Sequence, residues 1–338
     1  MYTINPKINN QMSLWLITMF WIVSIMIVVG GLTRLTDSGL SITEWQLFSG
    51  LFPPLSHNDW VKYFNLYKEI PEFKLQNYNM SIDEFKIIFW WEWVHRFLGR
   101  LIGICFLIPL IYFSFQINIR KLINLYLIFF LICIQGFIGW YMVKSGLVNR
   151  VDVSHFRLSL HLVTAFLILS LIFWNYLKLR INITISNKMN IYLPFTFLIL
   201  IFVQIIIGAF VSGMDAGKVY NTWPLMNGHF FPNDNDIINI FKVSALSDPS
   251  LVQFLHRNLA YIIGFSYIII LYKIYKNKMY DLYKSVNILG FIITIQIILG
   301  IFTVINGAHI YIAAMHQLTS IFLVTSSVYF FYINTKSS

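Results

Sequence analysis

The sequence predicts an all-α integral membrane protein with eight transmembrane helices, and three observations support this fold class. Only 11% of the 338 residues are charged, while 58% are hydrophobic; soluble domains average about 25% charged residues. Several long stretches contain no Asp, Glu, Lys or Arg at all. The chain also repeats itself, so that two copies of a four-helix unit account for the eight spans. Together these features predict two four-helix bundles related by a pseudo-twofold axis.

The charge-free stretches define the spans in chain order. A helix crosses the bilayer with about 20 apolar residues, and five runs have roughly this length: 13–33, 101–119, 122–143, 158–177 and 189–214. A sixth run, 258–272, is long enough when His256 and Arg257 are included. Residues 285–335 are too long for one crossing at about 1.5 Å per residue. The turn sequence "INGAH" (305–309) therefore divides them into the last two helices.

The net charge of +10 is distributed as expected for a membrane protein, and it does not indicate nucleic-acid binding. In the eight-helix arrangement Asp281 is the only acid on the side that collects these basic residues: Lys7, Arg120, Lys121, Lys178, Arg180, Lys188, Lys273, Lys276, Lys278, Lys284 and Lys336. Lys and Arg accumulate in cytoplasmic loops. Both termini are therefore predicted to be cytoplasmic, with the long segments 34–87 and 213–249 outside.

An internal duplication divides the chain into predicted halves 1–180 and 181–338. "GGLTRLTDSGLSITEW" (30–45) matches "GAFVSGMDAGKVYNTW" (208–223) at one constant offset, and "HRFLGRLIG" (95–103) matches "HRNLAYIIG" (256–264). "QGFIGWYMVKSG" (135–146) matches "QIILGIFTVING" (296–307), sharing Gln135 with Gln296 and Gly139 with Gly300. An even number of helices per copy predicts parallel repeats about an axis normal to the membrane.

Each copy places one histidine on its second helix and one on its fourth, giving the pairs His95 with His161 and His256 with His316. Even-numbered helices enter from outside, so all four are predicted to lie in the first turns of their helices, near the outer face. A single membrane histidine usually makes an interhelical hydrogen bond, but four at duplicated positions favour a shared ligand. Two imidazoles underligate zinc and suit the two axial positions of haem iron. The cysteines, Cys105 and Cys133, are interpreted as packing groups.

The stretch "EWVHR" adds an acid and a guanidinium to the first histidine site. Glu92 lies three residues before His95 and so shares its helix face; it could orient a ligand, stabilise positive charge or relay protons, or else pair with Arg96 or Arg34. Gln253 stands at the same position before His256. This difference predicts one reactive site, in the amino-terminal half, and one supporting site.

Each helix-2-type histidine is followed directly by an arginine, Arg96 in the first copy and Arg257 in the second. Bidentate pairing with a haem propionate is one chemical use of such an arginine, and snorkelling to lipid head groups is the other. The outer segment 47–93 mixes aromatic and charged residues at helical spacing. It is predicted to contain amphipathic helices at the interface.

With these motifs in place, the chain resembles the haem A synthase family over residues 14–333. The motifs that carry the resemblance are "GGLTRLTDSGLSITEW" with "LFPP", "EWVHR", "RLSLHL", "FVSGMDAGKVYNTWPLM", "QFLHR" and "AAMHQ". The resemblance implies successive hydroxylations that oxidise the C8 methyl of haem O to a formyl group, giving haem A for cytochrome oxidase. It differs from some bacterial members in having no cysteine pair in an outer loop.

The resemblance also implies cofactors, partners and location. Glu92, His95 and His161 would form the site that processes haem O, while His256 and His316 would hold a haem b. Haem O synthase, the cytochrome oxidase assembly machinery and an electron acceptor are the expected partners, in a bacterial inner membrane; a homo-oligomer is left open. Two alternatives stay open, a di-haem b-type electron-transfer cytochrome and a non-catalytic haem carrier.

Overall fold

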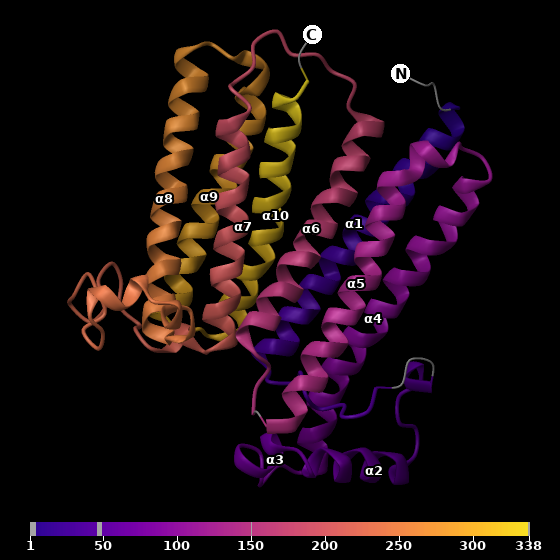
Figure 1. Ribbon diagram of the computed structural model, residues 1–338, viewed down its shortest axis with the longest axis vertical. Helices are drawn as coiled ribbons and strands as arrows, with labels where there is room; N and C mark the ends of the chain where they lie inside the picture. Colours follow the sequence, from indigo (N-terminus) through magenta and orange to yellow (C-terminus); the bar gives the residue numbers. More distant parts are fainter. Residues whose placement is uncertain (1–4, 46–48, 150, 337–338) are drawn as a thin grey trace. The chain divides into compact units, whose positions relative to one another are not determined.

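The computed structural model describes residues 5–45, 49–149 and 151–336, and within them the fold is helical with no strand. Eight helices are long and apolar enough to cross a membrane. They are α1 (Pro6–Leu35), α4 (Ile82–Ser114), α5 (Ile119–Asn149), α6 (His155–Arg180), α7 (Tyr192–Gly213), α8 (Pro249–Lys276), α9 (Tyr280–Ile305) and α10 (Ile310–Asn334) (Figure 1). The predicted all-α membrane fold and its eight spans are confirmed, including the division of the last charge-free run at 305–309.

The chain contacts divide into two compact units, Met1–Phe20 with Phe166–Ser338, and Trp21–Ala165. In the first unit, α7 packs on α8, α8 on α9, α9 on α10 and α10 on α7, so these four helices close a ring. Tyr332 of α10 donates a hydrogen bond to the carbonyl of Leu177 in α6 at 3.1 Å. In the second unit, α4 packs on α5.

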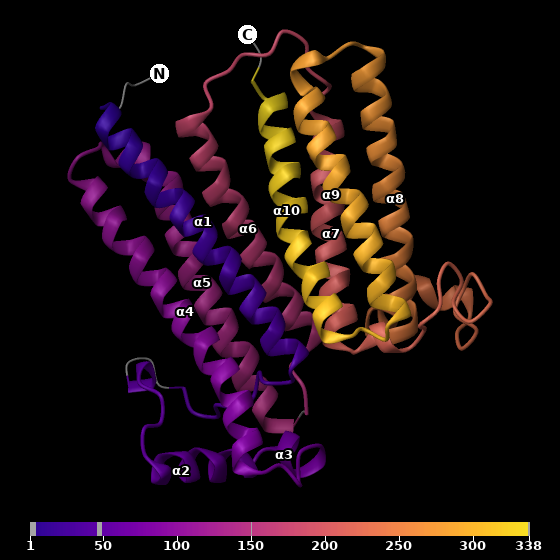
Figure 2. The same cartoon turned by 180° about the vertical axis from the view of Figure 1, so that it is seen from behind.

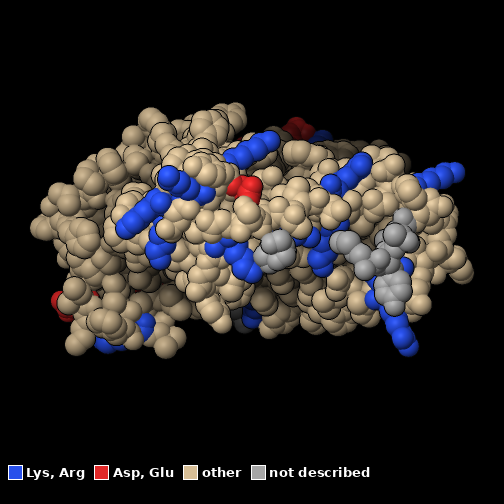
Figure 3. All heavy atoms as spheres, turned by 90° about the horizontal axis from the view of Figure 1, so that it is seen from above, with Lys and Arg blue, Asp and Glu red and all other residues tan. Residues whose placement is uncertain are grey.

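The start of α1 and the end of α10 both belong to the first unit and lie at the same end of its helices (Figures 1 and 2). The last turn of α6 contains Lys178 and Arg180, and that of α8 contains Lys273 and Lys276. Viewed from above, the protein presents many Lys and Arg side chains and few acids (Figure 3). This distribution is the one on which the predicted membrane orientation rests.

Helix α4 begins much farther out than the sequence indicates. A capping box starts it: Ser81 accepts from the Glu84 amide, and the Glu84 carboxylate accepts from the Ser81 amide. Such reciprocal caps satisfy backbone donors that a helix start leaves free. His95 is consequently the fourteenth residue of α4, so its predicted place in the first turns is wrong. The other three site histidines are each the seventh or eighth residue of their helices.

The outer extension of α4 is covered by two short helices, α2 (His57–Lys68) and α3 (Pro71–Leu75) (Figure 1). Phe64 and Tyr67 of α2 form an apolar cluster with Phe85, Ile88 and Phe89 of α4. The predicted amphipathic helices are therefore present, and they pack on protein through their apolar face. Residues 46–48 of this outer segment lie outside the described part of the chain.

The cover itself contains a buried carboxyl group, on α3. Glu72 is 3% exposed; its Oε1 accepts from the Tyr67 hydroxyl at 3.1 Å, and its Oε2 has no hydrogen-bond partner. Burial raises the pKa of the Glu72 carboxyl to about 8, and the negative charges of Glu92, Asp152 and Asp37 act in the same direction.

The stability of the α2–α3 cover should therefore fall as the pH rises. The folded carboxyl keeps its proton between pH of about 4.3, the ordinary Glu pKa, and about 8, whereas the opened form releases it, so opening becomes easier across this window. Replacing Glu72 by Gln should remove the effect and stabilise the cover on the order of 3 kcal/mol at pH 7. Amide hydrogen exchange of residues 57–75 measures this opening. Glu69→Gln, at an exposed position, is the matched control, and equal pH profiles for Glu72→Gln and the unmodified protein would contradict the assignment.

The duplication extends to the backbone of the outer segments. Asp37 and Asp215, one repeat apart, both adopt the left-handed conformation, with φ of 47° and 51°. Short polar side chains tolerate this conformation better than other residues with a Cβ. After Asp215 the second outer segment continues through η2 (Ala216–Lys218), η3 (Ile237–Phe241) and η4 (Val243–Ser247) before α8 begins.

Candidate functional site

The four duplicated histidines meet in two pairs, each within one unit. His95 of α4 faces His161 of α6 with ring centres 6.4 Å apart. His256 of α8 faces His316 of α10 with ring centres 6.5 Å apart. The two distances agree closely although the helices differ in sequence and length. In the described chain, no three or more His, Cys, Asp or Glu side chains gather as a metal-ion site. The imidazole pair is therefore the unit that repeats.

Each of these four imidazoles rests against a glycine of the long helix that precedes its own helix in the chain. A Cβ added to the glycine would lie within 2.8–3.1 Å of the histidine Cε1 in each of these contacts: Gly30 with His95, Gly139 with His161, Gly208 with His256 and Gly300 with His316. Real Cβ atoms are essentially never found below 3.0 Å, and rarely below 3.4 Å. Glycine is required here for close approach rather than for a special φ. The sequence identifies these glycines as marks of the repeat, but it does not reveal this contact.

Gly139→Ala should therefore push the His161 ring out of its position. Overpacking of this kind costs about 1–3 kcal/mol, and we expect a lower unfolding temperature together with a changed environment of the histidine pair. Thermal unfolding in detergent, with NMR of isotope-labelled histidine, measures both. Gly136→Ala on the same helix meets nothing within 4 Å and should leave both unchanged. The same small response from the two variants would refute the packing argument.

Glu92 is buried, 2% exposed, and both oxygens of its carboxylate accept hydrogen bonds from other residues. Its Oε2 accepts from the Ser41 hydroxyl and from the Ile42 amide, each at 2.7 Å. Its Oε1 accepts from Nε and Nη2 of Arg96, at 3.1 and 2.6 Å. The pairing with Arg96 that the sequence left open is thus present. The partners Ser41 and Ile42 have no counterpart in the sequence prediction.

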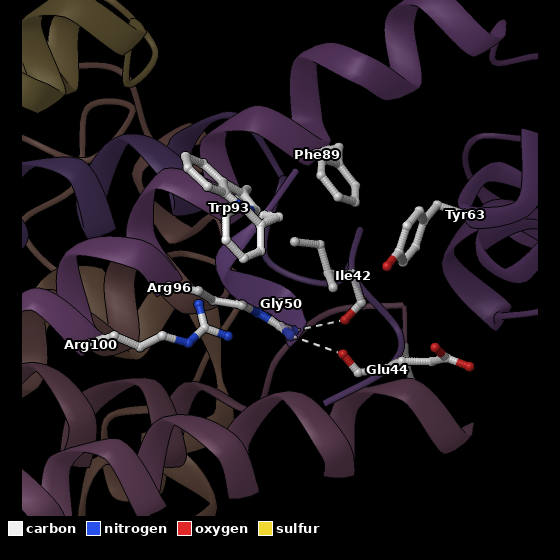
Figure 4. A pocket seen from close by; sticks show the side chains of 9 residues that line it. Ile42, Glu44, Gly50, Tyr63, Phe89, Trp93, Arg96 and Arg100 are labelled. Carbon is white, nitrogen blue, oxygen red and sulfur yellow. Dashed lines mark hydrogen bonds between the residues drawn. The ribbon is translucent and has the colours of Figure 1, made fainter. Parts of the chain in front are cut away.

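Arg96 also ties down the outer segment. It donates to the carbonyl oxygens of Ile42 at 2.7 Å and Glu44 at 3.2 Å (Figure 4). Three of its nitrogens are therefore engaged with Glu92 and with the backbone that follows α1.

The second copy repeats this tie at the equivalent positions. Arg257 donates to the carbonyl oxygens of Tyr220 at 2.7 Å and Thr222 at 2.8 Å. Gln253, in the place of Glu92, donates to the same Tyr220 carbonyl at 3.0 Å. Ile42 with Tyr220, and Glu44 with Thr222, are related by the constant offset of the repeat. The arrangement is thus conserved between the copies, whereas the carboxylate occurs only in the first.

A small pocket opens beside this arginine at the junction of α4 and its cover (Figure 4). Its lining combines aromatic rings with two guanidinium groups: Ile42, Glu44, Gly50, Phe52, Tyr63, Phe89, Trp93, Arg96 and Arg100. Arg100 lies one helical turn after Arg96, the spacing that puts two side chains on one face. The sequence gives Arg100 no role; its i+4 spacing from Arg96 is the signal that could have identified it.

These features define a class, a multi-pass helical membrane protein in which a repeated unit presents pairs of histidines. Within that class the chain belongs to the COX15–CtaA family of cytochrome oxidase assembly proteins, whose family model matches residues 13–328.

Individual relatives match over nearly their whole length. The chain is 50% identical to the heme A synthase of Pelagibacter ubique, over 99% of this chain and 100% of that protein. It is 42% identical to the heme A synthase of Rickettsia bellii strain OSU 85-389, covering 94% and 96% of the two chains. It is 41% identical to the heme A synthase of Maricaulis maris, covering 95% of each.

Proposed function

We propose that this protein is a haem A synthase, an oxidoreductase that converts the C8 methyl of haem O to a formyl group by successive hydroxylations. The observation that carries the proposal is the spacing of the two imidazole pairs. Two imidazoles on opposite faces of one iron have ring centres about 6.3 Å apart, taking about 2.0 Å per metal–nitrogen bond, as for zinc, and about 1.1 Å from nitrogen to ring centre. The measured separations are 6.4 and 6.5 Å.

The Nδ1 atoms of His95, His161 and His256 are buried and lack hydrogen-bond partners, so these rings are not tied to protein groups through that atom. Bound haem iron supplies redox chemistry that amino-acid side chains cannot provide. The protein's own residues hold the porphyrin, exclude water and manage protons.

The two halves, 1–180 and 181–338, are assigned different roles. His95 and His161 hold haem O for processing in the first half, and His256 and His316 hold a haem b in the second. The difference between Glu92 and Gln253 supports this division, because only the first site has an ionisable group one turn from its histidine. Glu92 acts there as the group that holds or moves a proton at its carboxylate.

We assign two roles to Arg96 and Arg257. They carry positive charge toward the haem propionates, and they hold the backbone of the outer segments through hydrogen bonds to its carbonyls. Arg96 spends Nε, Nη1 and Nη2 on Glu92 and on backbone carbonyls, whereas Arg257 spends Nη1 and Nη2 on backbone carbonyls and its buried Nε has no hydrogen-bond partner. The contribution of Arg96 to a propionate is therefore one of charge more than of bidentate hydrogen bonding. Arg100, in the pocket beside Arg96, is the better placed partner for a carboxylate of the first haem.

The proposed setting follows from the charge distribution and from the family. Basic residues collect at the helix ends near both termini, so the termini face the cytoplasm of a bacterium and the histidine sites face the outer side of its inner membrane. Haem O synthase supplies the substrate, cytochrome oxidase assembly takes up the product, and a separate acceptor takes the electrons. A lipid-soluble haem enters from the bilayer. The number of copies in the assembly, homo-oligomer included, is an outcome to be measured.

The test is expression in a host that makes haem O but not haem A, followed by extraction and mass identification of the haems. Haem A or its hydroxylated precursor is the expected product. Bound haem b with unchanged haem O, in folded protein, would overturn the synthase assignment and leave the electron-transfer cytochrome or the carrier. The same host with empty vector is the control.

A further inference from the structure

Three of the four histidines accept a hydrogen bond at their backbone carbonyl from a glutamine on another helix. A glutamine stands four residues before the glycine that supports each ring, at Gln135, Gln204 and Gln296. The spacing places amide and glycine on the same face of one helix. Each amide Nε2 donates to the backbone carbonyl of the histidine itself: Gln135 to His161 at 2.8 Å, Gln204 to His256 at 3.0 Å and Gln296 to His316 at 3.1 Å.

In the second half of the chain the amides also lie beside the imidazole rings. The Nε2 atom of Gln204 is 3.4 Å from Nε2 of His256, and that of Gln296 is 3.4 Å from both ring nitrogens of His316. The Oε1 atoms of all three glutamines are buried and have no hydrogen-bond partner: Gln135, Gln204 and Gln296. Each of these oxygens can therefore accept a hydrogen bond from a group that becomes a donor nearby.

A histidine that binds a metal through one ring nitrogen has such a donor on the other. An imidazole bound to iron through Nε2 carries its proton on Nδ1, and ligating histidines almost always donate this proton to a neighbouring oxygen. The hydrogen bond fixes the tautomer and the ring orientation, and it makes the ligand more basic. Each of the three glutamines carries a buried oxygen without a partner, on the same amide that holds the histidine's backbone carbonyl, and this oxygen could take that proton.

The fourth site breaks the pattern. Met26 stands four residues before Gly30, where the other three helices carry glutamine. Its Cε lies 3.5 Å from the position of a Cβ on Gly99, so the side chain packs along α4, the helix of His95. A thioether sulfur is only a weak acceptor. The Nδ1 atoms of His95, His161 and His256 are all buried without a hydrogen-bond partner, but only at His95 does the supporting helix carry no glutamine at this spacing.

We propose that Gln135, Gln204 and Gln296 are positioning residues that secure three of the four axial histidines, and that Met26 makes His95 the ligand released most easily. The inference rests on the proposed haem ligation and deepens it. His95 lies one turn from Glu92. The ligand position that opens would therefore be the one beside the carboxylate that the second site replaces with Gln253. In the second half both axial positions are secured and the haem stays closed.

The test exchanges the two residue types in the full-length protein, produced in a host that makes only haem b. Carbon monoxide binding to the reduced protein reports an axial position that opens. Met26→Gln should slow carbon monoxide binding at the first haem about 10- to 100-fold, the usual effect of an outer-sphere partner. Gln204→Met, which removes both the donor to the His256 carbonyl and the acceptor oxygen, should make the second haem reactive. Met26→Leu, which adds no acceptor, should keep the unmodified rate.

The outcomes separate this proposal from the one beneath it. If the unmodified protein binds haem without the low-spin spectrum of two imidazole ligands, the ligation scheme fails and the proposal fails with it. If that spectrum is present but neither exchange changes carbon monoxide binding, only the glutamine and methionine assignment is overturned. Because Met26→Gln and Gln204→Met act in different helices, a folding defect in one leaves the other decisive.

Discussion

Replacing Glu92 by glutamine is expected to lower turnover of haem O by at least about 100-fold while both haems stay bound, since a positioned acid or base contributes about 10²–10⁴-fold. The chain should still fold, because Gln253 occupies the equivalent place beside Arg257, but Gln253 donates to the Tyr220 carbonyl whereas Glu92 accepts all its hydrogen bonds. The variant therefore removes the charge and one or more of these hydrogen bonds while side-chain volume changes little. Single-turnover conversion of haem O, with haem content measured in parallel, gives the answer.

A matched control for this prediction lies on the same helix. Asp83 is an exposed acid near the start of α4, paired with Lys86 at 2.8 Å, and Asp83→Asn should leave turnover within a few-fold of the unmodified protein. Retained turnover in Glu92→Gln, with both haems bound, would remove Glu92 from the chemistry and leave it as the partner of Arg96 and Ser41.

Replacing His256 by alanine is expected to remove one of two haem equivalents and to lower turnover at least about 10-fold. The ring spans the space to His316 and rests on Gly208, so its loss deprives one iron of an axial ligand while the first pair stays intact. Losing a ligand of a metal site weakens it at least as much as losing an outer-sphere partner, which costs about 10–100-fold. Haem stoichiometry and the low-spin spectrum of the purified protein measure the effect.

The control for the second histidine pair is His229→Ala. His229 lies exposed in the outer segment, where its backbone bridges Met226. Its replacement should keep both haem equivalents. Full haem content in His256→Ala would place the second haem elsewhere, and equal losses in the two variants would indicate misfolding rather than a lost ligand.

Most of the fold could be predicted from the sequence because membrane spans are encoded locally. A run of about 20 uncharged residues identifies a span wherever the helix packs, and the seven charge-free runs, the last divided at 305–309, predict the eight long helices found in the described residues. The error at α4 has a local cause as well. Arg100 ends the charge-free run, but the helix continues outward past it to the capping box at Ser81 and packs there against α2.

The site was predictable as a set of residues and less so as a set of contacts. Duplication alone identifies His95, His161, His256 and His316, because matching motifs in the two copies place them on equivalent helices. The partners of Glu92 could not be inferred in this way. Ser41 and Ile42 reach it from about 50 residues away, after α1 ends and the chain turns at Asp37.

What the sequence determined by itself is the number of helices, the repeat, and the difference between Glu92 and Gln253, since each is a local or periodic property of the chain. Tertiary structure alone decided which carbonyls Arg96 and Arg257 bind, that each of the four imidazoles rests on a glycine, and that Met26 packs against Gly99 on the helix of His95. Those contacts depend on how far each helix is rotated about its own axis and how closely its neighbour approaches. These quantities are fixed by the packing of all the helices in a unit, and no single segment contains them.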